Sequence, residues 1–442
     1  MRWLLGITCL IAPCVAAAVA ASAAPQFSVI HTFTGGTDGA YPTIGLLRGA
    51  DGSLYGTTEG GDVKSTFGTV FKLSPPVHDG ASWTKTNLYA FQGRKDGAYP
   101  WTRLIFDGNT AALLGTTAGD DGHGDIGTIF RLAPPKHDGN PWTEQILHRF
   151  KGGTDSGFPY DGLVQDPATG AIYGTAYGNS GSGDFGTVFG YTPDIQHKNW
   201  SETLHYNFTA MEGNGAFPEA GLVLGSGGLL YGTTLGGGAQ DDSCFTNGVG
   251  GFIPGCGTVF SVNVATGEAN FLLLPSFTTK QPVYFSYGEL LLDDNSNIFG
   301  LSQGGAFPLD KCKLKNHTTC GTVFTMLPES DTKAKVISKL IGANSGQSEG
   351  GLIWNQAKTV LYGTTTIGGP GCDADKKYGC GVVFKLTQDG KDWDYSVIYA
   401  FTGGADGYRA RDLVIDGNGT LYGEAELGGA NGVGTVFKIE TP

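Results

Sequence analysis

Short apolar segments separated by glycine-rich turns follow one another along this chain of 442 residues. In the unit that begins at Gly45, four such segments cover residues 46–47, 54–58, 68–73 and 83–91. Apolar and polar residues roughly alternate in the last of them, as in a strand with one buried face. Turn signals such as Asp51-Gly52 separate the segments. The pattern predicts four short antiparallel strands in this unit.

The same unit is repeated along the whole chain. Its first half, Leu54-Tyr55-Gly56-Thr57-Thr58, recurs with substitutions beginning at Leu114, Tyr173, Tyr231, Phe299, Tyr362 and Tyr422. Its second half, Gly-Thr-Val-Phe or a near variant, begins at Gly68, Gly127, Gly186, Gly257, Gly321, Gly381 and Gly434. The Tyr-Gly-Thr-Thr positions lie 59, 59, 58, 68, 63 and 60 residues apart, a period that indicates a repeat architecture. Seven units of four strands predict an all-β, seven-bladed β-propeller.

The two ends of the chain complement each other. Residues 27–33 match the fourth segment of other units, whereas the last unit stops after its third segment, residues 434–439. We therefore expect the N-terminal strand to complete the seventh blade and to close the ring, which removes exposed sheet edges. A linear solenoid, the alternative, would not need complementary incomplete ends. Residues 24–442 are thus expected to form a single propeller domain.

The N-terminus has the features of a secretory signal peptide. Met1-Arg2 precedes an apolar run over residues 3–21, and Ala21-Ser22-Ala23 supplies the small residues of a cleavage site. We expect residues 1–23 to be removed on export to the periplasm or the medium. An uncleaved membrane anchor is the alternative, for which the run is on the short side, and no other segment is apolar enough to span a bilayer.

Export gives the cysteines a structural role. Six of the eight follow the signal segment, and three of those directly precede a repeat's second half. Because the compartment is oxidising and each has one partner upstream in the same loop, we predict three bridges, Cys244–Cys256, Cys312–Cys320 and Cys372–Cys380. Zinc is the competing interpretation, but no two cysteines have Cys-x-x-Cys spacing.

The repeated phrases carry a family resemblance. Gly-Gly-x-Asp-Gly-x-x-Pro, Leu-Tyr-Gly-Thr-Thr and Gly-Thr-Val-Phe-Lys-Leu, in this order, resemble the GloVer (Gloeo/Verruco) tandem repeat of exported bacterial proteins. The resemblance covers nearly all of the chain after residue 23 and implies no particular reaction. Some relatives carry a C-terminal surface anchor. Because the sequence ends three residues after a repeat strand, at Pro442, we expect an unanchored protein.

Residues shared by all units are expected to be structural. Aspartates in Gly-x-Asp-Gly turns cap their own turns, and tryptophans at the start of fourth strands anchor the blades. The first set is Asp38, Asp96, Asp155 and Asp406, and the second is Trp83, Trp142, Trp200 and Trp393.

Departures from the repeat are more informative about function, and they gather where each first strand would enter the channel mouth. There the units carry Thr43, Trp101 with Arg103, Tyr160 with Asp161, Glu219, Tyr287 with Glu289, Glu349, and Arg409 with Arg411 and Asp412. Aromatic rings beside carboxylates and guanidiniums suit a sugar ligand. We predict a ligand site formed by Trp101, Arg103, Tyr160, Asp161, Glu219, Glu289 and Arg409. A solvated rim of locally paired charges is the alternative.

A catalytic set can be proposed in the seventh unit. Glu424 stands where Thr57 stands in the first unit, and Arg411 and Asp412 belong to the same blade. Glu424 and Asp412 could form an acid/base pair for glycoside cleavage, and the separation of their carboxyl groups would decide the mechanism. A surface salt-bridge cluster is the alternative.

Two other motifs are set aside. Residues 300–304 match Gly-x-Ser-x-Gly, but the hydrolase elbow requires a following helix that the pattern does not contain. The acidic loop around His123, residues 120–125, could bind calcium but lacks the twelve-residue ligand pattern. We therefore predict no cofactor, with calcium left open.

Two functions remain. The first is a secreted, monomeric binding or scaffold propeller that contacts a polysaccharide or an exported protein, but not nucleic acid, which the net charge of −13 disfavours. The second is a polysaccharide lyase or glycosidase. Convergence of Arg103, Glu289, Arg411, Asp412 and Glu424 in one cavity would favour the enzyme, and local ion pairs around the rim would favour binding.

Overall fold

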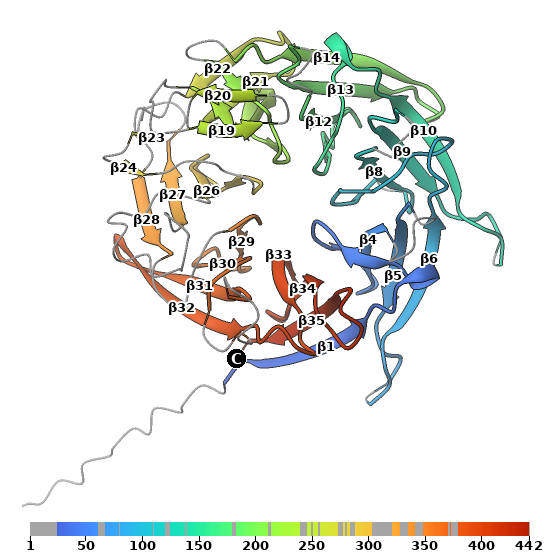
Figure 1. The fold of residues 1–442 in the computed structure, drawn as a ribbon, viewed down its shortest axis with the longest axis vertical. Helices are drawn as coiled ribbons and strands as arrows, with labels where there is room; N and C mark the ends of the chain where they lie inside the picture. The colour runs from blue at the N-terminus through green and yellow to red at the C-terminus, as the bar shows by residue number, and fades with distance from the viewer. Residues whose placement is uncertain are drawn as a thin grey trace, which may run out of the picture.

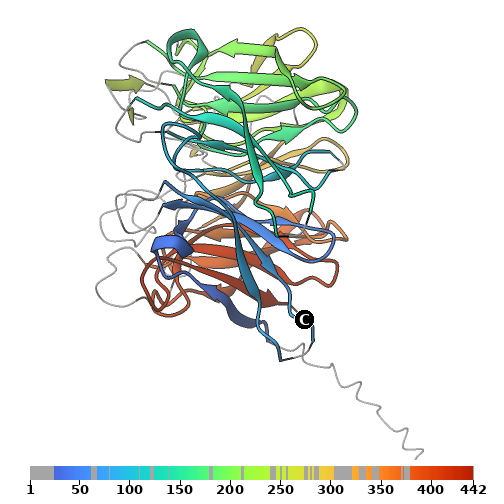
Figure 2. The same ribbon diagram turned by 90° about the vertical axis from the view of Figure 1, so that its right-hand side faces the viewer.

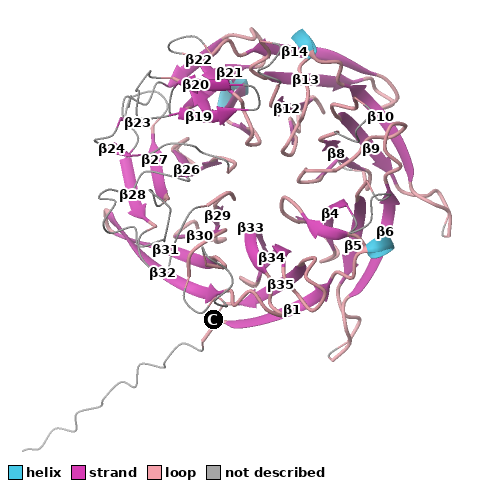
Figure 3. Cartoon of the chain, in the orientation of Figure 1, coloured by secondary structure: helices cyan, strands magenta, loops and turns pink. Residues whose placement is uncertain are grey.

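The computed structural model describes residues 24–60, 67–78, 80–108, 110–119, 124–137, 139–178, 183–210, 214–238, 245–248, 251–254, 257–272, 277–278, 281–282, 288–302, 321–327, 335–340, 348–369, 372 and 379–441. Within them the chain forms seven antiparallel blades around a central channel (Figure 1). Helical structure there is confined to short turns (Figure 3). The predicted seven-bladed β-propeller is confirmed. The predicted signal peptide, the acidic loop from 120 to 123 and Tyr287 lie outside the described residues.

The blades follow the repeat along the chain. Blade 1 is β3 (Leu47–Arg48), β4 (Leu54–Gly60), β5 (Thr69–Ser74) and β6 (Thr84–Ala90), with β2 (Ala40–Pro42) also paired to β4. Blade 2 is β7 (Ile105–Phe106), β8 (Leu113–Thr117), β9 (Thr128–Ala133) and β10 (Thr143–Arg149). Blade 3 is β11 (Val164–Gln165), β12 (Ile172–Ala176), β13 (Thr187–Pro193) and β14 (Trp200–Asn207). Blade 4 is β16 (Val223–Leu224), β17 (Leu229–Thr234), β21 (Thr258–Asn263) and β22 (Ala269–Leu272).

The second half of the ring has the same order. Blade 5 is β25 (Leu291–Leu292), β26 (Ile298–Ser302), β27 (Thr322–Met326) and β28 (Lys335–Lys339). Blade 6 is β29 (Ile353–Trp354), β30 (Val360–Thr365), β31 (Val382–Asp389) and β32 (Asp392–Ala400). Blade 7 is β33 (Tyr408–Ile415), β34 (Leu421–Leu427), β35 (Thr435–Glu440) and β1 (Gln26–Thr32). Three two-stranded sheets lie outside the blades: β15 (Gly215–Ala216) with β18 (Gly236–Gly237), β19 (Phe245–Gly248) with β20 (Gly251–Pro254), and β23 (Phe277–Thr278) with β24 (Gln281–Pro282).

The N-terminal strand closes the ring, as predicted. β1 pairs antiparallel with β35, from Gln26 opposite Glu440 to Thr32 opposite Thr435. Phe27 of β1 also stacks on Tyr399 of blade 6, with ring centroids 3.8 Å apart. Seen from the side, the strands run across the thickness of a disc (Figure 2).

The repeated phrase is explained by packing inside the blades. Phe71 of Gly-Thr-Val-Phe is fully buried, and a Cβ added to Gly56 would lie 2.6 Å from its ring. The same approach recurs in the next blade, where a Cβ on Gly115 would lie 2.7 Å from Phe130. Only glycine leaves room for the phenylalanine ring, so the Tyr-Gly-Thr-Thr glycine follows from the packing.

The first threonine of Tyr-Gly-Thr-Thr ties a blade to its neighbour in blades 1, 2, 3 and 6. The Thr57 hydroxyl donates a hydrogen bond to the Thr102 carbonyl of blade 2 at 3.1 Å, and Thr175 donates to Ala220 of blade 4 at 3.0 Å. These carbonyls belong to the segments that lead into the first strands. The second strands therefore hold the channel-mouth segments in place.

The shared residues have the structural roles predicted for them. Asp96 accepts hydrogen bonds from the Gln92 backbone N–H at 2.8 Å and the Tyr89 hydroxyl at 2.7 Å, which fixes its turn. Trp83 packs edge-on against Tyr422 of the preceding blade, with ring centroids 5.9 Å apart. Ser302 of the Gly-x-Ser-x-Gly string is fully buried on β26.

One of the predicted disulfides lies in the described residues and is confirmed. Cys372 and Cys380 are bonded, with their Cα atoms 5.6 Å apart. The other four cysteines, Cys244, Cys256, Cys312 and Cys320, lie outside the described residues. No helix in the described part of the chain is both long and apolar enough to cross a membrane.

Candidate functional site at the channel mouth

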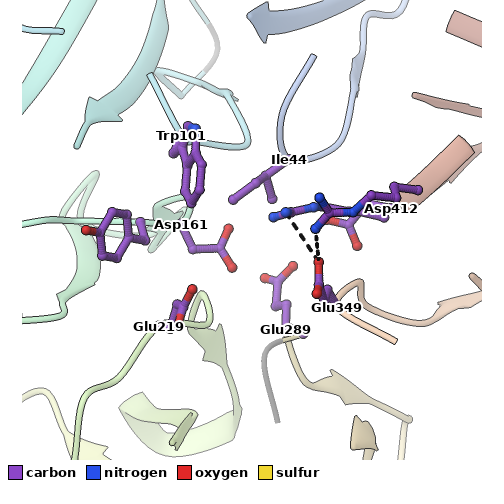
Figure 4. Close-up of a pocket in the computed structure, with 11 residues that line it drawn as sticks. Ile44, Trp101, Asp161, Glu219, Glu289, Glu349 and Asp412 are labelled. Carbon is purple, nitrogen blue, oxygen red and sulfur yellow. Dashed lines mark hydrogen bonds and ion pairs between the residues drawn. The ribbon is translucent and has the colours of Figure 1, made fainter. Parts of the chain in front are cut away.

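A cavity of about 160 Å³ opens at the mouth of the channel. It is lined by Ile44, Trp101, Tyr160, Asp161, Glu219, Gly288, Glu289, Glu349, Arg409, Arg411 and Asp412 (Figure 4). The segments that enter the first strands supply these residues from all seven blades. Eight of the residues predicted from the sequence line this cavity.

A recurrent backbone turn presents these segments to the cavity. Five non-glycine residues that begin them have φ between 55° and 61°, a region that favours glycine, and they are Tyr41, Tyr99, Phe158, Phe217 and Arg409. Each donates its backbone N–H to the preceding blade; Phe217, for example, donates to the Phe185 carbonyl at 2.8 Å. The Arg409 N–H donates to the carbonyl of Cys380 at 3.2 Å. The confirmed disulfide thus restrains the residue that holds Arg409 at the cavity.

Arg103 crosses the channel beneath the cavity. From blade 2 its guanidinium reaches Glu289 of blade 5 at 2.5 Å and Asp412 of blade 7 at 3.3 Å. A second cavity of about 310 Å³ is lined by Arg103, and Asp161 and Glu289 line both cavities. The Arg103 bridge is therefore the floor of the upper cavity.

A second ion-pair cluster forms one wall. Arg409 and Arg411 both contact Glu349, at 3.4 and 3.3 Å, and both contact Glu426, at 3.4 and 3.1 Å. Figure 4 shows the pairs with Glu349 as dashed lines. The Arg411 guanidinium also lies over the Trp101 ring, 5.7 Å from its centroid. The arginines are thus held by local pairs, as the alternative interpretation of the sequence expected, while they face the cavity.

Two carboxyl groups stand apart from these pairs. Asp161 accepts the backbone N–H groups of Gly162 and Gly221, both at 2.5 Å. Burial raises the pKa of Asp161 to about 7, although the Arg103 charge opposes the shift. Burial also raises the pKa of Glu219 to about 7, with Arg411 opposing and Glu349 adding to the shift. The cavity therefore contains two carboxyl groups that exchange protons near neutral pH.

Glu424 does not line the cavity. Its side chain is only 3% exposed, and neither carboxyl oxygen has a hydrogen-bond partner among the described residues. Its Oε1 atom lies against β4 of blade 1, 2.7 Å from the position of a Cβ on Gly56. Burial raises the pKa of Glu424 well above the ordinary range, and the Asp412 carboxylate raises it further. Glu424 is thus a buried acid between two blades, with a raised pKa.

Two further carboxyl groups lie beside the site, Glu59 and Glu426, and neither is among the site residues predicted from the sequence. Glu59 lies beside Trp101 in an adjacent cavity, and burial, reinforced by the Glu426 charge, raises the pKa of Glu59. Glu59 and Glu426 follow the Tyr-Gly-Thr-Thr position in units 1 and 7, where unit 2 has Ala118. This departure is visible in the sequence. In the described part of the chain, no group of three or more His, Cys, Asp or Glu residues could hold a metal ion.

Comparison with known proteins adds a family match. A model of the Gloeobacter/Verrucomicrobia repeat matches residues 19–246 and 244–437. A search of curated proteins found no significant match.

Solved structures among those matched include the PQQ-bound aldose sugar dehydrogenase from Streptomyces coelicolor, at 13% identity and a TM-score of 0.44, covering 96% of this chain and 100% of that chain. An α-L-arabinanase from Penicillium chrysogenum complexed with arabinobiose has 13% identity and a TM-score of 0.43, and the match covers 78% of this chain and 94% of the arabinanase. A protein from Lactobacillus plantarum has 12% identity and a TM-score of 0.49, and the match covers 81% of this chain and 84% of that protein.

Proposed function

The chain belongs to the Gloeobacter/Verrucomicrobia repeat family, and from this premise we propose that it is a glycan-binding module whose channel-mouth cavity holds one sugar ring. The observation that carries the proposal is the meeting of an aromatic wall and several carboxyl groups in a cavity of this size. The cavity measures about 160 Å³, and an engineered protein cavity of about 150 Å³ binds benzene. The cavity therefore has room for the core of one six-membered ring, and because it opens at the channel mouth, the substituents of that ring can extend outside it.

The lining supplies both kinds of contact that a sugar needs. Trp101 and Tyr160 form the aromatic wall, with ring centroids 5.5 Å apart, and offer an apolar surface to the C–H face of a sugar. In Figure 4 the carboxylates of Asp161 and Glu289 point toward the middle of the cavity. Carboxylates accept hydrogen bonds from hydroxyl groups, and such charge-assisted bonds fix the orientation of a ligand.

The proposed place of action is outside the cytoplasm. The sequence features of residues 1–23 are those of a signal peptide, and the Cys372–Cys380 disulfide is compatible with an oxidising compartment. Exported polysaccharides are the glycans that such a protein would meet.

The test is a screen of purified residues 24–442 against a panel of polysaccharides by thermal shift, followed by calorimetry on those that bind. We expect Trp101→Ala to weaken binding by about tenfold, because an aromatic contact is worth about 1 kcal/mol and some apolar contact is also lost. Trp101→Phe should retain most of the affinity. Trp83→Phe, which changes an aromatic residue at the outer edge of a blade, is the matched control. Full affinity in Trp101→Ala would contradict the proposed site.

A second candidate, a polysaccharide lyase or glycosidase, is favoured by one observation. Asp161 and Glu219 come from neighbouring blades, line the same cavity, and have pKa values raised to about 7. Such a pair supplies one proton donor and one acceptor near neutral pH. If the protein is an enzyme, we expect oligosaccharide release to peak near pH 7 and to be lost in Glu219→Gln, with binding retained. Release that is unchanged in this variant would exclude Glu219 as the acid or base.

A further inference from the structure

We infer that the sugar held in the channel-mouth cavity carries a protonated amine, as a hexosamine unit without an acetyl group does. This inference rests on the proposed function and names the class of its ligand. It follows from which charges around the cavity already have partners and which do not.

The three guanidinium groups at the site are already neutralised. Arg103 is paired with Glu289 and Asp412, while Arg409 and Arg411 share Glu349 and Glu426. An anionic sugar, such as a uronic acid, would have to displace one of these carboxylates to reach an arginine. It would also bring its own charge next to the carboxyl groups that line the cavity, and like charges at close range repel.

The carboxyl groups outnumber the guanidiniums. Asp161 and Glu219 both line the cavity, and the salt bridges of Arg103 and Arg411 in the described part of the chain go to other carboxylates. The charges of these arginines reach Asp161 and Glu219 only at longer range. Asp161 is 8% exposed, and its two oxygens are held by the backbone N–H groups of Gly162 and Gly221. Its carboxylate is therefore fixed in place before a ligand arrives, and each oxygen has a further lone pair available.

An ammonium group matches this arrangement. Placed between Asp161 and Glu219, it would supply the positive charge that the buried carboxyl groups lack and would donate hydrogen bonds to both. The aromatic wall of Trp101 and Tyr160 adds to the match, because ring faces attract cations. A neutral sugar obtains the hydroxyl and apolar contacts but no charge compensation.

The test compares three tetrasaccharides by titration calorimetry at pH 5.5, where the sugar amine already holds its proton: glucosamine, N-acetylglucosamine and galacturonate oligomers. We expect the glucosamine oligomer to bind about tenfold or more tightly than its acetylated counterpart, since hydrogen bonds to charged groups add roughly tenfold or more in affinity. Its binding should also release protons, measured in two buffers of different ionisation enthalpy. The reason is that an ammonium lowers the pKa of Asp161 and Glu219, which start near 7.

A charge-removing variant separates the inference from the proposed function. Glu219→Gln should reduce affinity for the glucosamine oligomer about tenfold and remove the part of the proton release that comes from Glu219, while it weakens binding of the acetylated oligomer less. Glu202→Gln, an exposed carboxyl change on β14, is the matched control. Equal or tighter binding of the acetylated or galacturonate oligomer would overturn the inference and leave glycan binding standing. If no saccharide binds, the proposed function fails and the inference fails with it.

Discussion

Replacing Arg103 with methionine is expected to lower the free energy of unfolding by roughly 3 kcal/mol at neutral pH. Methionine keeps much of the side-chain length but leaves Glu289 and Asp412 without their counter-charge, and Asp412 is only 6% exposed. Breaking one partner of a buried ion pair is costly because the remaining charge stays desolvated. Chemical denaturation of wild type and variant at pH 7 measures the loss. The loss should be smaller at pH 5, because burial raises the pKa of Glu289, one of the two carboxyl groups left without a counter-charge.

A triple variant provides the control for this prediction. Adding Glu289→Gln and Asp412→Asn to Arg103→Met removes the orphaned charges, and most of the lost stability should return. Arg103→Met as stable as wild type would show that the bridge across the channel contributes nothing to the closed ring. A triple variant as unstable as Arg103→Met would show that the charges are not the cause.

Replacing Glu424 with threonine is expected to raise the free energy of unfolding by about 1–3 kcal/mol at pH 7, the usual cost of an unsatisfied buried polar group. Threonine is the residue of the first unit at this position, where Thr57 bonds to the next blade. The gain depends on pH. Because burial raises the pKa of Glu424, the folded protein keeps a proton that the unfolded chain releases, and wild-type stability falls as pH rises.

Denaturation at pH 4, 6 and 8 checks the sign of this effect. The advantage of Glu424→Thr should be smallest at pH 4, where both folded and unfolded wild type hold the proton, and should increase toward pH 8. Glu202→Gln removes an exposed carboxyl group and should show no such trend. An advantage that is constant across these pH values would show that folding does not shift the pKa of Glu424.

The fold could be predicted because the same contact between a glycine and a phenylalanine recurs from unit to unit. Gly56 and Phe71 form one packed pair, and Gly115 and Phe130 repeat it, so the period in the sequence is the period of the structure. The closure of the ring could also be predicted from the sequence, because the first and last segments of the chain are strands of one blade.

The site was predictable only in part. Positions that enter the first strands could be aligned across units, which is why Trp101, Tyr160 and Glu219 were found. The sequence does not give the width of the channel, so it could not show that Arg103 spans it to Glu289.

Of the five residues whose convergence was to favour an enzyme, Glu289, Arg411 and Asp412 line the cavity and Arg103 forms its floor. Glu424 does not join them because it occupies the buried Thr57 position between blades. Glu424 and Asp412 belong to the same blade, but only Asp412 lines the cavity.

A crystal structure of residues 24–442 with the tightest-binding saccharide of the panel would show directly whether the cavity holds a sugar. We predict one sugar ring in the cavity, against Trp101 and Tyr160 and within hydrogen-bonding distance of Asp161 or Glu219. A saccharide bound on the outer edges of the blades, with the channel-mouth cavity holding only water, would contradict this prediction.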